Sequence, residues 1–186
     1  MQMNRKYLYI IPLLLFLFSF SCKNNNQSSR APISHRHKGV DMKSVNMNKE
    51  LNNREETYIE KMIKEDSLHQ YIDSHHGFWY YYISENEKDN IFPREGDKVT
   101  LKYEIKDLSG NTIYSFNEIG EKIYHVDHEN YFRGFREAVK LLKKDEEAEF
   151  LFPSNAAYGY HGDEKKIGNN VPLKVKIKIL KIKKTK

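Results

Sequence analysis

Residues 148–159 read Ala-Glu-Phe-Leu-Phe-Pro-Ser-Asn-Ala-Ala-Tyr-Gly. The first five of them are rich in large apolar side chains and predict a β-strand. Pro153 ends this strand, because proline has no backbone N–H to donate to a neighbouring strand. The segment that follows, 153–159, is short and closes on an aromatic residue and a glycine.

Further strands are expected on both sides of this stretch. Residues 99–105 and 173–179 alternate apolar and polar side chains, which predicts strands with one buried face. The aromatic run 78–83 and the segment 112–116 have the same β character. Between these strands, residues 131–142 have helical spacing, with Phe135, Val139 and Leu142 on one face. The sum is an α+β domain, in which an antiparallel sheet surrounds one central helix.

These residues resemble the FKBP-type peptidyl-prolyl cis-trans isomerases. Tyr103 in an alternating strand, a turn ending in Gly110 and Gly134-Phe135 at a helix start follow the family's order. The segment Pro-Ser-Asn-Ala-Ala-Tyr-Gly at 153–159 and the final strand continue it, so that the resemblance covers residues 77–186. Together with the beginning of the chain, the aromatic run after Gly77 is similar to a narrower group, the gliding-motility-associated FKBP-type lipoproteins.

The resemblance implies a half-barrel sheet wrapped around one short helix, with an aromatic pocket that binds a prolyl residue. The implied catalytic residues are Tyr103, Phe132, Phe135 and Tyr158. The implied substrate-binding residues are Ile113, Tyr114, Ile167 and Val175. Rotation about an X–Pro bond must overcome a barrier of about 18–20 kcal/mol. It needs no cofactor and no metal, and an apolar pocket that excludes water favours the twisted, less dipolar amide.

Three positions depart from the family's usual pattern. Tyr114 stands where the family usually carries an Asp, and Phe135 where Trp is commoner. Lys122 occupies a place where an aromatic residue is expected. The missing carboxylate favours reduced activity. Alternatives therefore stay open: a catalytically weak chaperone that kept the fold, or an assembly component of an envelope complex.

The first residues resemble a bacterial lipoprotein signal. Arg5 and Lys6 precede an apolar run of about a dozen residues, the length typical of an export signal. Cys22, the only cysteine, follows Phe-Ser-Phe-Ser at 18–21, which is similar to a lipobox. We therefore expect a signal peptide over 1–21, lipidation of Cys22 and anchoring to a membrane, since acyl chains insert into lipid. The expected location is the cell envelope, at the outer membrane on its periplasmic side.

Two segments connect this anchor to the domain. Residues 22–48 carry few aromatic or aliphatic side chains, which predicts a disordered tether. Residues 49–76 show partial helical spacing of apolar residues, which predicts an amphipathic helix. Its apolar stripe either packs on the following domain, residues 77–186, or pairs with a second copy in a homodimer.

The net charge of +5 does not indicate nucleic-acid binding. Two of the positive charges lie in the signal segment and seven lysines lie in residues 174–186, so the intervening chain is net acidic. Aromatic residues do not alternate with these lysines as a nucleic-acid platform would need. We interpret them as a lysine face that protects an edge strand from mispairing. The expected partners are proline-containing exported proteins and the membrane.

Overall fold

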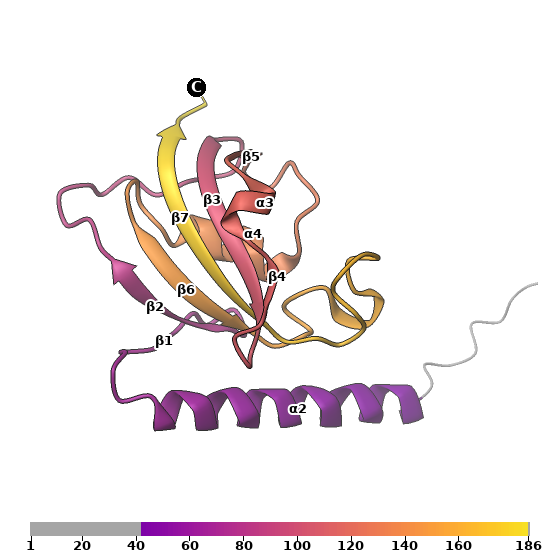
Figure 1. Cartoon of the computed structure of the whole chain (residues 1–186). Coiled ribbons are helices and arrows are strands. Elements are labelled where there is room, and N and C mark those ends of the chain that lie inside the picture. The colour runs from indigo at the N-terminus through magenta and orange to yellow at the C-terminus, as the bar shows by residue number, and fades with distance from the viewer. Residues whose placement is uncertain (1–41, 186) are drawn as a thin grey trace, which may run out of the picture. The chain divides into compact units, whose positions relative to one another are not determined.

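The computed structural model describes residues 42–185, which form a helix, a curved antiparallel sheet and a short helix packed on that sheet (Figure 1). The helices are α2 (Met42–Glu65), α3 (Phe116–Ile119) and α4 (Arg133–Lys140), with a 3₁₀ turn, η1 (Gly159–His161). The strands are β1 (Ile72–Asp73), β2 (Trp79–Ser84), β3 (Lys98–Asp107), β4 (Thr112–Tyr114), β5 (Lys122–His125), β6 (Glu147–Phe152) and β7 (Leu173–Lys183). Within this part of the chain, no helix is long and apolar enough to cross a membrane.

The seven strands form one antiparallel sheet in the order β1-β2-β6-β7-β3-β4, and β5 pairs with the first half of β3. This arrangement confirms the predicted α+β class and the antiparallel sheet. Each long strand that the sequence predicted is present, with its ends shifted by a few residues. The exception is 112–116, where the strand stops at Tyr114 and α3 begins at Phe116, with the side chain of Ser115 accepting the N–H of Glu118 as its cap.

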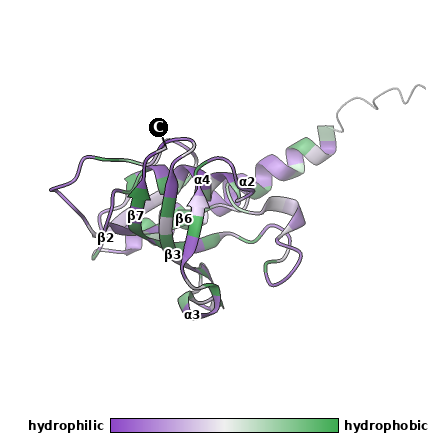
Figure 2. Cartoon of the chain, turned by 90° about the horizontal axis from the view of Figure 1, so that it is seen from above, coloured by the Kyte–Doolittle hydropathy of each residue, from purple (hydrophilic) through white to green (hydrophobic). Residues whose placement is uncertain are grey.

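The alternating pattern of β7 places its apolar residues in the core. Leu173, Val175, Ile177 and Ile179 are all fully buried. Val175 lies opposite Phe150 of β6 and Ile105 of β3, so both neighbouring strands contribute to the same apolar layer. Figure 2 shows hydrophobic residues gathered on these strands, whereas α2 is mainly hydrophilic.

The lysines of β7 lie on the opposite face of the sheet, and the expectation that they protect an edge is wrong. Strand β7 is central, because it pairs with β6 on one side and β3 on the other. Lys174 pairs with Glu149 at 3.6 Å, and Lys178 with Glu147 at 3.2 Å. Lys176 lies 3.5 Å from Glu104 of β3. The lysines therefore alternate with glutamates of neighbouring strands, and such cross-strand pairs stabilise a sheet modestly.

Helix α4 approaches the sheet unusually closely at its first turn. Gly134 donates its backbone N–H to the carbonyl of Ala156 at 2.8 Å. A Cβ atom at this position would lie 2.6 Å from the ring of Phe152 and 2.7 Å from the oxygen of Ala156. Only glycine fits here, and its absence of a side chain lets Phe135, Ala138 and Val139 bury completely against the sheet.

Helix α2 differs in extent from the predicted helix 49–76. It already includes residues 42–48 of the predicted tether, all of which are exposed. It ends at Glu65, and the side chain of Asp66 then accepts the N–H of Leu68 at 2.9 Å. Such local bonds compete with the helix. Residues 1–41, which include the predicted signal and Cys22, lie outside the described residues.

Helix α2 packs on the domain of the same chain through two buried side chains, one apolar and one acidic. Ile59 is fully buried, and Glu55 is 8% exposed. The carboxylate of Glu55 accepts the backbone N–H of Ser154 at 2.7 Å and its hydroxyl at 2.9 Å. Ser154 directly follows the Pro153 that ends β6. Helix α2 is thus fixed to the 153–159 segment.

Replacement of Glu55 by alanine is expected to lower the free energy of unfolding by about 1–3 kcal/mol, because it leaves two donors of the buried Ser154 without an acceptor. Urea unfolding of the full chain measures this change. Glu60→Ala is the matched control, since Glu60 is exposed on the same helix, and we expect it to change stability by less than about 0.5 kcal/mol. Equal effects of the two substitutions would show that the contact with Ser154 contributes nothing.

The substitution Gly134→Ala is expected to destabilise the domain by about 3 kcal/mol, because backbone and ring atoms must move to admit one methyl group. The control is Gly168→Ala, where the nearest atom to an added Cβ lies 3.9 Å away. Thermal unfolding followed by circular dichroism compares the two. A Gly134→Ala protein as stable as the control would contradict the close approach.

Candidate functional site

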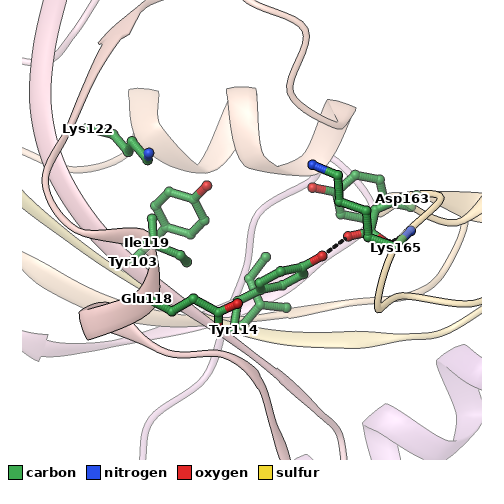
Figure 3. Close-up of a pocket in the computed structure, with 9 residues that line it drawn as sticks. Tyr103, Tyr114, Glu118, Ile119, Lys122, Asp163 and Lys165 are labelled. Carbon is green, nitrogen blue, oxygen red and sulfur yellow. Dashed lines mark hydrogen bonds between the residues drawn. The ribbon is translucent and has the colours of Figure 1, made fainter.

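A pocket of about 440 Å³ opens between β3, β4, α3 and the loop that follows Tyr158. Figure 3 shows Tyr103 and Tyr114 near each other, with the hydroxyl of Tyr114 directed at Asp163 and the side chains of Glu118, Lys122 and Lys165 around them. Nine residues line it: Tyr103, Ile105, Tyr114, Glu118, Ile119, Lys122, Tyr158, Asp163 and Lys165. Aromatic and aliphatic surface thus meets four charged side chains, so this lining is more polar than that of most ligand pockets.

Tyr103 enters the pocket from the middle of β3. It lies on the same face of the strand as Ile105, because alternate residues of a strand share a face. Its ring meets the ring of Phe135 edge-on, with 5.0 Å between the centroids. Burial, with a smaller contribution from the neighbouring Tyr131, raises the pKa of Tyr103 far above its ordinary value. The hydroxyl therefore stays protonated and able to donate.

Tyr158 is placed by the turn that follows β6. Within this turn, the carbonyl of Pro153 accepts the N–H of Ala156 at 3.0 Å, and the carbonyl of Ser154 accepts that of Gly159 at 2.8 Å. The ring of Tyr158 lies 4.9 Å from that of Phe132. Burial, and then the nearby Asp163 and Tyr114, raises the pKa of Tyr158 to about 12. Its hydroxyl is also a protonated donor at neutral pH.

Tyr114 and Asp163 close the pocket on its outer side. The hydroxyl of Tyr114 donates to Oδ2 of Asp163, whereas Oδ1 accepts the N–H of Ile167 at 2.7 Å and that of Lys165 at 3.0 Å. Burial raises the pKa of Tyr114, and the bond to Asp163 adds to the effect. Burial also opposes ionisation of Asp163, but the bonds it accepts outweigh this and lower its pKa. The ionised carboxylate holds the loop to β4.

The predicted site residues divide into two groups. The structure brings Tyr103, Tyr114 and Tyr158 together around the pocket. The other five lie in or against the core beneath or beside it: Phe132, Phe135, Ile113, Ile167 and Val175. Phe135, the predicted floor, is fully buried, with the ring of Tyr131 stacked on it at 4.6 Å. Their roles in catalysis and binding stay predictions, and Cys22 lies outside the described residues.

Sequence reasoning missed much of the polar lining. Asp163 and Lys165 belong to the loop after Gly162, to whose charged side chains no role is assigned from the sequence, and Glu118 and Ile119 come from a short helix that the sequence did not predict. Ile105 could have been found, because it follows Tyr103 by two residues in an alternating strand. Tyr131, which contacts both Tyr103 and Phe135, immediately precedes Phe132 and was not assigned a role.

The chemistry available in this pocket is binding and orientation. Protonated phenol hydroxyls can donate to a carbonyl oxygen, while the aromatic surface around them accepts an apolar ring. Among residues 42–185, no group of three His, Cys, Asp or Glu side chains is positioned to hold a metal ion.

Comparisons with known proteins identify one matching family and a similar protein. Residues 89–180 match the family model of the FKBP-type peptidyl-prolyl cis-trans isomerases. Over 90 residues the chain is 34% identical to a probable FKBP-type peptidyl-prolyl cis-trans isomerase, FkpA, of Neisseria meningitidis serogroup B. That match covers 48% of this chain and 33% of the relative, so the chain spans about a third of that protein's length.

Removal of the Asp163 carboxylate is expected to release the loop it holds. In Asp163→Ala, the amide of Ile167 should exchange with solvent about tenfold faster, because a hydrogen bond to a charged group contributes about 1.5 kcal/mol or more. Hydrogen exchange measured by NMR tests this, with Glu164→Ala as the neighbouring control. In the unchanged chain, the stabilisation is present above the ordinary pKa of 3.8 and is lost as the pH falls through the lower folded value. Unchanged protection of Ile167 in Asp163→Ala would contradict this role.

Proposed function

Because the chain belongs to the FKBP-type peptidyl-prolyl cis-trans isomerase family through residues 89–180, we propose that it catalyses cis-trans isomerisation of X–Pro bonds in protein substrates. The observation that carries the proposal is the grouping of Tyr103, Tyr114 and Tyr158 around one pocket. The buried aromatic layer of Phe132 and Phe135 lies next to them. A prolyl ring has the size and apolar character to enter such a space.

Isomerisation requires the amide to twist out of its plane, which breaks the resonance of the C–N bond. The planar amide is more dipolar than the twisted one, so transfer from water to the aromatic surface beside Tyr103 and Tyr158 disfavours the planar ground state. The reaction breaks no covalent bond and moves no proton. The protein therefore contributes by binding the twisted form more tightly than the planar form.

The tyrosine hydroxyls orient the substrate. Tyrosine hydroxyls are protonated at neutral pH, and burial raises the pKa values of Tyr103 and Tyr158 further. The hydroxyl of Tyr158 can donate to a substrate carbonyl, whereas that of Tyr103 lies beside Tyr131. Such a bond fixes the chain on one side of the proline while the other side rotates. Tyr114 has its hydroxyl already engaged with Asp163, and its role is to hold the loop beside the pocket.

We further propose that the protein acts at a membrane on exported proteins. Support comes from the basic and apolar start of the chain and from Cys22 after a lipobox-like segment. Lipidation of Cys22 would hold the protein in the cell envelope, at the outer membrane on the periplasmic side. The resemblance to gliding-motility-associated lipoproteins suggests substrates among the proteins of that machinery. A homodimer through 49–76 would use side chains that α2 leaves exposed, such as Tyr58.

A second candidate is a chaperone that binds unfolded chains with weak catalysis. The observation that favours it is the pairing of Tyr114 with Asp163, which occupies the carboxylate beside the pocket. Suppressed aggregation of an unfolded protein, without faster refolding, would support this candidate over the enzyme. An assembly role in an envelope complex would show as co-purification that depends on α2.

Refolding of a substrate limited by proline isomerisation tests the proposed activity. The full chain is expected to accelerate the slow phase, and Tyr158→Phe should lower kcat/KM by about 2- to 10-fold, the effect of one lost hydrogen bond. Tyr160→Phe is the control, since Tyr160 is exposed and lies outside the pocket lining. A folded protein that leaves the slow phase unchanged would overturn the proposal.

A further inference from the structure

The acidic side chains of the pocket have hydrogen-bond or ion-pair partners, whereas the side chains of its two lysines have none in the described part of the chain. The carboxylate of Glu118 pairs with the Nζ atom of Lys166, and that of Asp163 accepts three hydrogen bonds. Lys166 is also engaged elsewhere, because its Nζ lies 4.8 Å above the ring of Tyr114 and donates to the carbonyl of Ile113 at 3.3 Å. Glu118 is therefore neutralised by an ion pair, whereas Asp163 keeps its negative charge and has its oxygens occupied by neutral donors.

The two lysines of the lining are not compensated. Neither Lys122 nor Lys165 has a side-chain hydrogen bond or an ion pair with any residue of 42–185, and both are exposed. The acidic residue next to Lys122 in the chain, Glu121, is itself paired with Lys102 at 3.2 Å. Figure 3 shows Lys122 on one side of the tyrosines and Lys165 with Asp163 on the other. Two free ammonium groups thus flank the place where a substrate would enter.

We propose that this pocket selects X–Pro segments with an acidic residue next to the proline, and that Lys122 and Lys165 determine this specificity. The inference rests on the proposed function of the pocket. A Glu or Asp side chain beside a bound proline would gain an ion pair with one of the lysines, whereas a Lys or Arg side chain would be repelled. The tyrosines would bind the proline itself, and the lysines would discriminate between side-chain charges at the residue beside it.

Capped peptides that differ only beside the proline test the inference on the full chain. Glu, Gln and Lys are placed in turn before the proline, and a second series places them after it. For each peptide, kcat/KM is measured by NMR exchange and affinity by calorimetry. At low salt, the Glu peptide of at least one series should exceed the Gln peptide by about two- to fivefold, since each exposed ion pair contributes modestly. The Lys peptide should rank last, and high salt should remove the ranking.

Variants then assign the effect to the two lysines. In the double variant Lys122→Gln, Lys165→Gln, the ratio of Glu to Gln peptides should fall close to unity. Lys88→Gln is the matched control, because Lys88 is exposed and lies outside the pocket lining, and it should keep the wild-type ratio. A double variant that keeps the ratio would overturn the assignment.

The remaining outcomes separate the inference from the proposed function. Equal kcat/KM and equal affinity for Glu and Gln peptides in both series overturn the charge preference, while isomerisation of both peptides would leave the enzyme proposal standing. Failure to isomerise any peptide overturns the enzyme proposal. In that case, the ratio of affinities from calorimetry decides the charge preference by itself.

Discussion

The close approach of Gly134 to Phe152 and Ala156 is the constraint on which the rest of the domain depends. It sets the depth of α4 against the sheet, and thereby places Phe135 beneath Tyr103. The hydrogen bond from Gly134 to Ala156 also joins the helix start to the turn that carries Tyr158. Any larger residue would push the helix and this turn apart. The geometry of the pocket is thus a consequence of a packing contact in the core.

The sequence predicted the strands well where a period of two persists over several residues. Residues 173–179 alternate without interruption, and β7 follows them with its apolar side chains buried. The same pattern could not show which strands would lie beside β7, because the partners Glu149 and Glu104 come from distant parts of the chain. The lysine face was therefore recognised, but its place at the centre of the sheet was not.

In the candidate site, too, some residues could be predicted from the sequence and others could not. Tyr103, Tyr114 and Tyr158 were identified through motifs that are contiguous in the sequence, and the structure brings them to one pocket. The partner of Tyr114 lies 49 residues further along, in a charged loop where nothing in the local sequence indicates this pairing. Sequence patterns describe local geometry, whereas the pairing of Tyr114 with Asp163 depends on the tertiary structure that brings the end of β4 beside the loop before β7. The same tertiary structure places Lys122 and Lys165, which are 43 positions apart in the sequence, in the lining of one pocket.

The contact between Glu55 and Ser154 has a consequence for the order of folding. The two residues are separated by 99 positions, so the cost in chain entropy of bringing them together is high until the sheet between them has formed. Helix α2 is made before every strand of the domain, yet its docking surface is completed only when β6 and the turn after it are in place. The docking of α2 therefore depends on a contact that the sheet must first bring within reach.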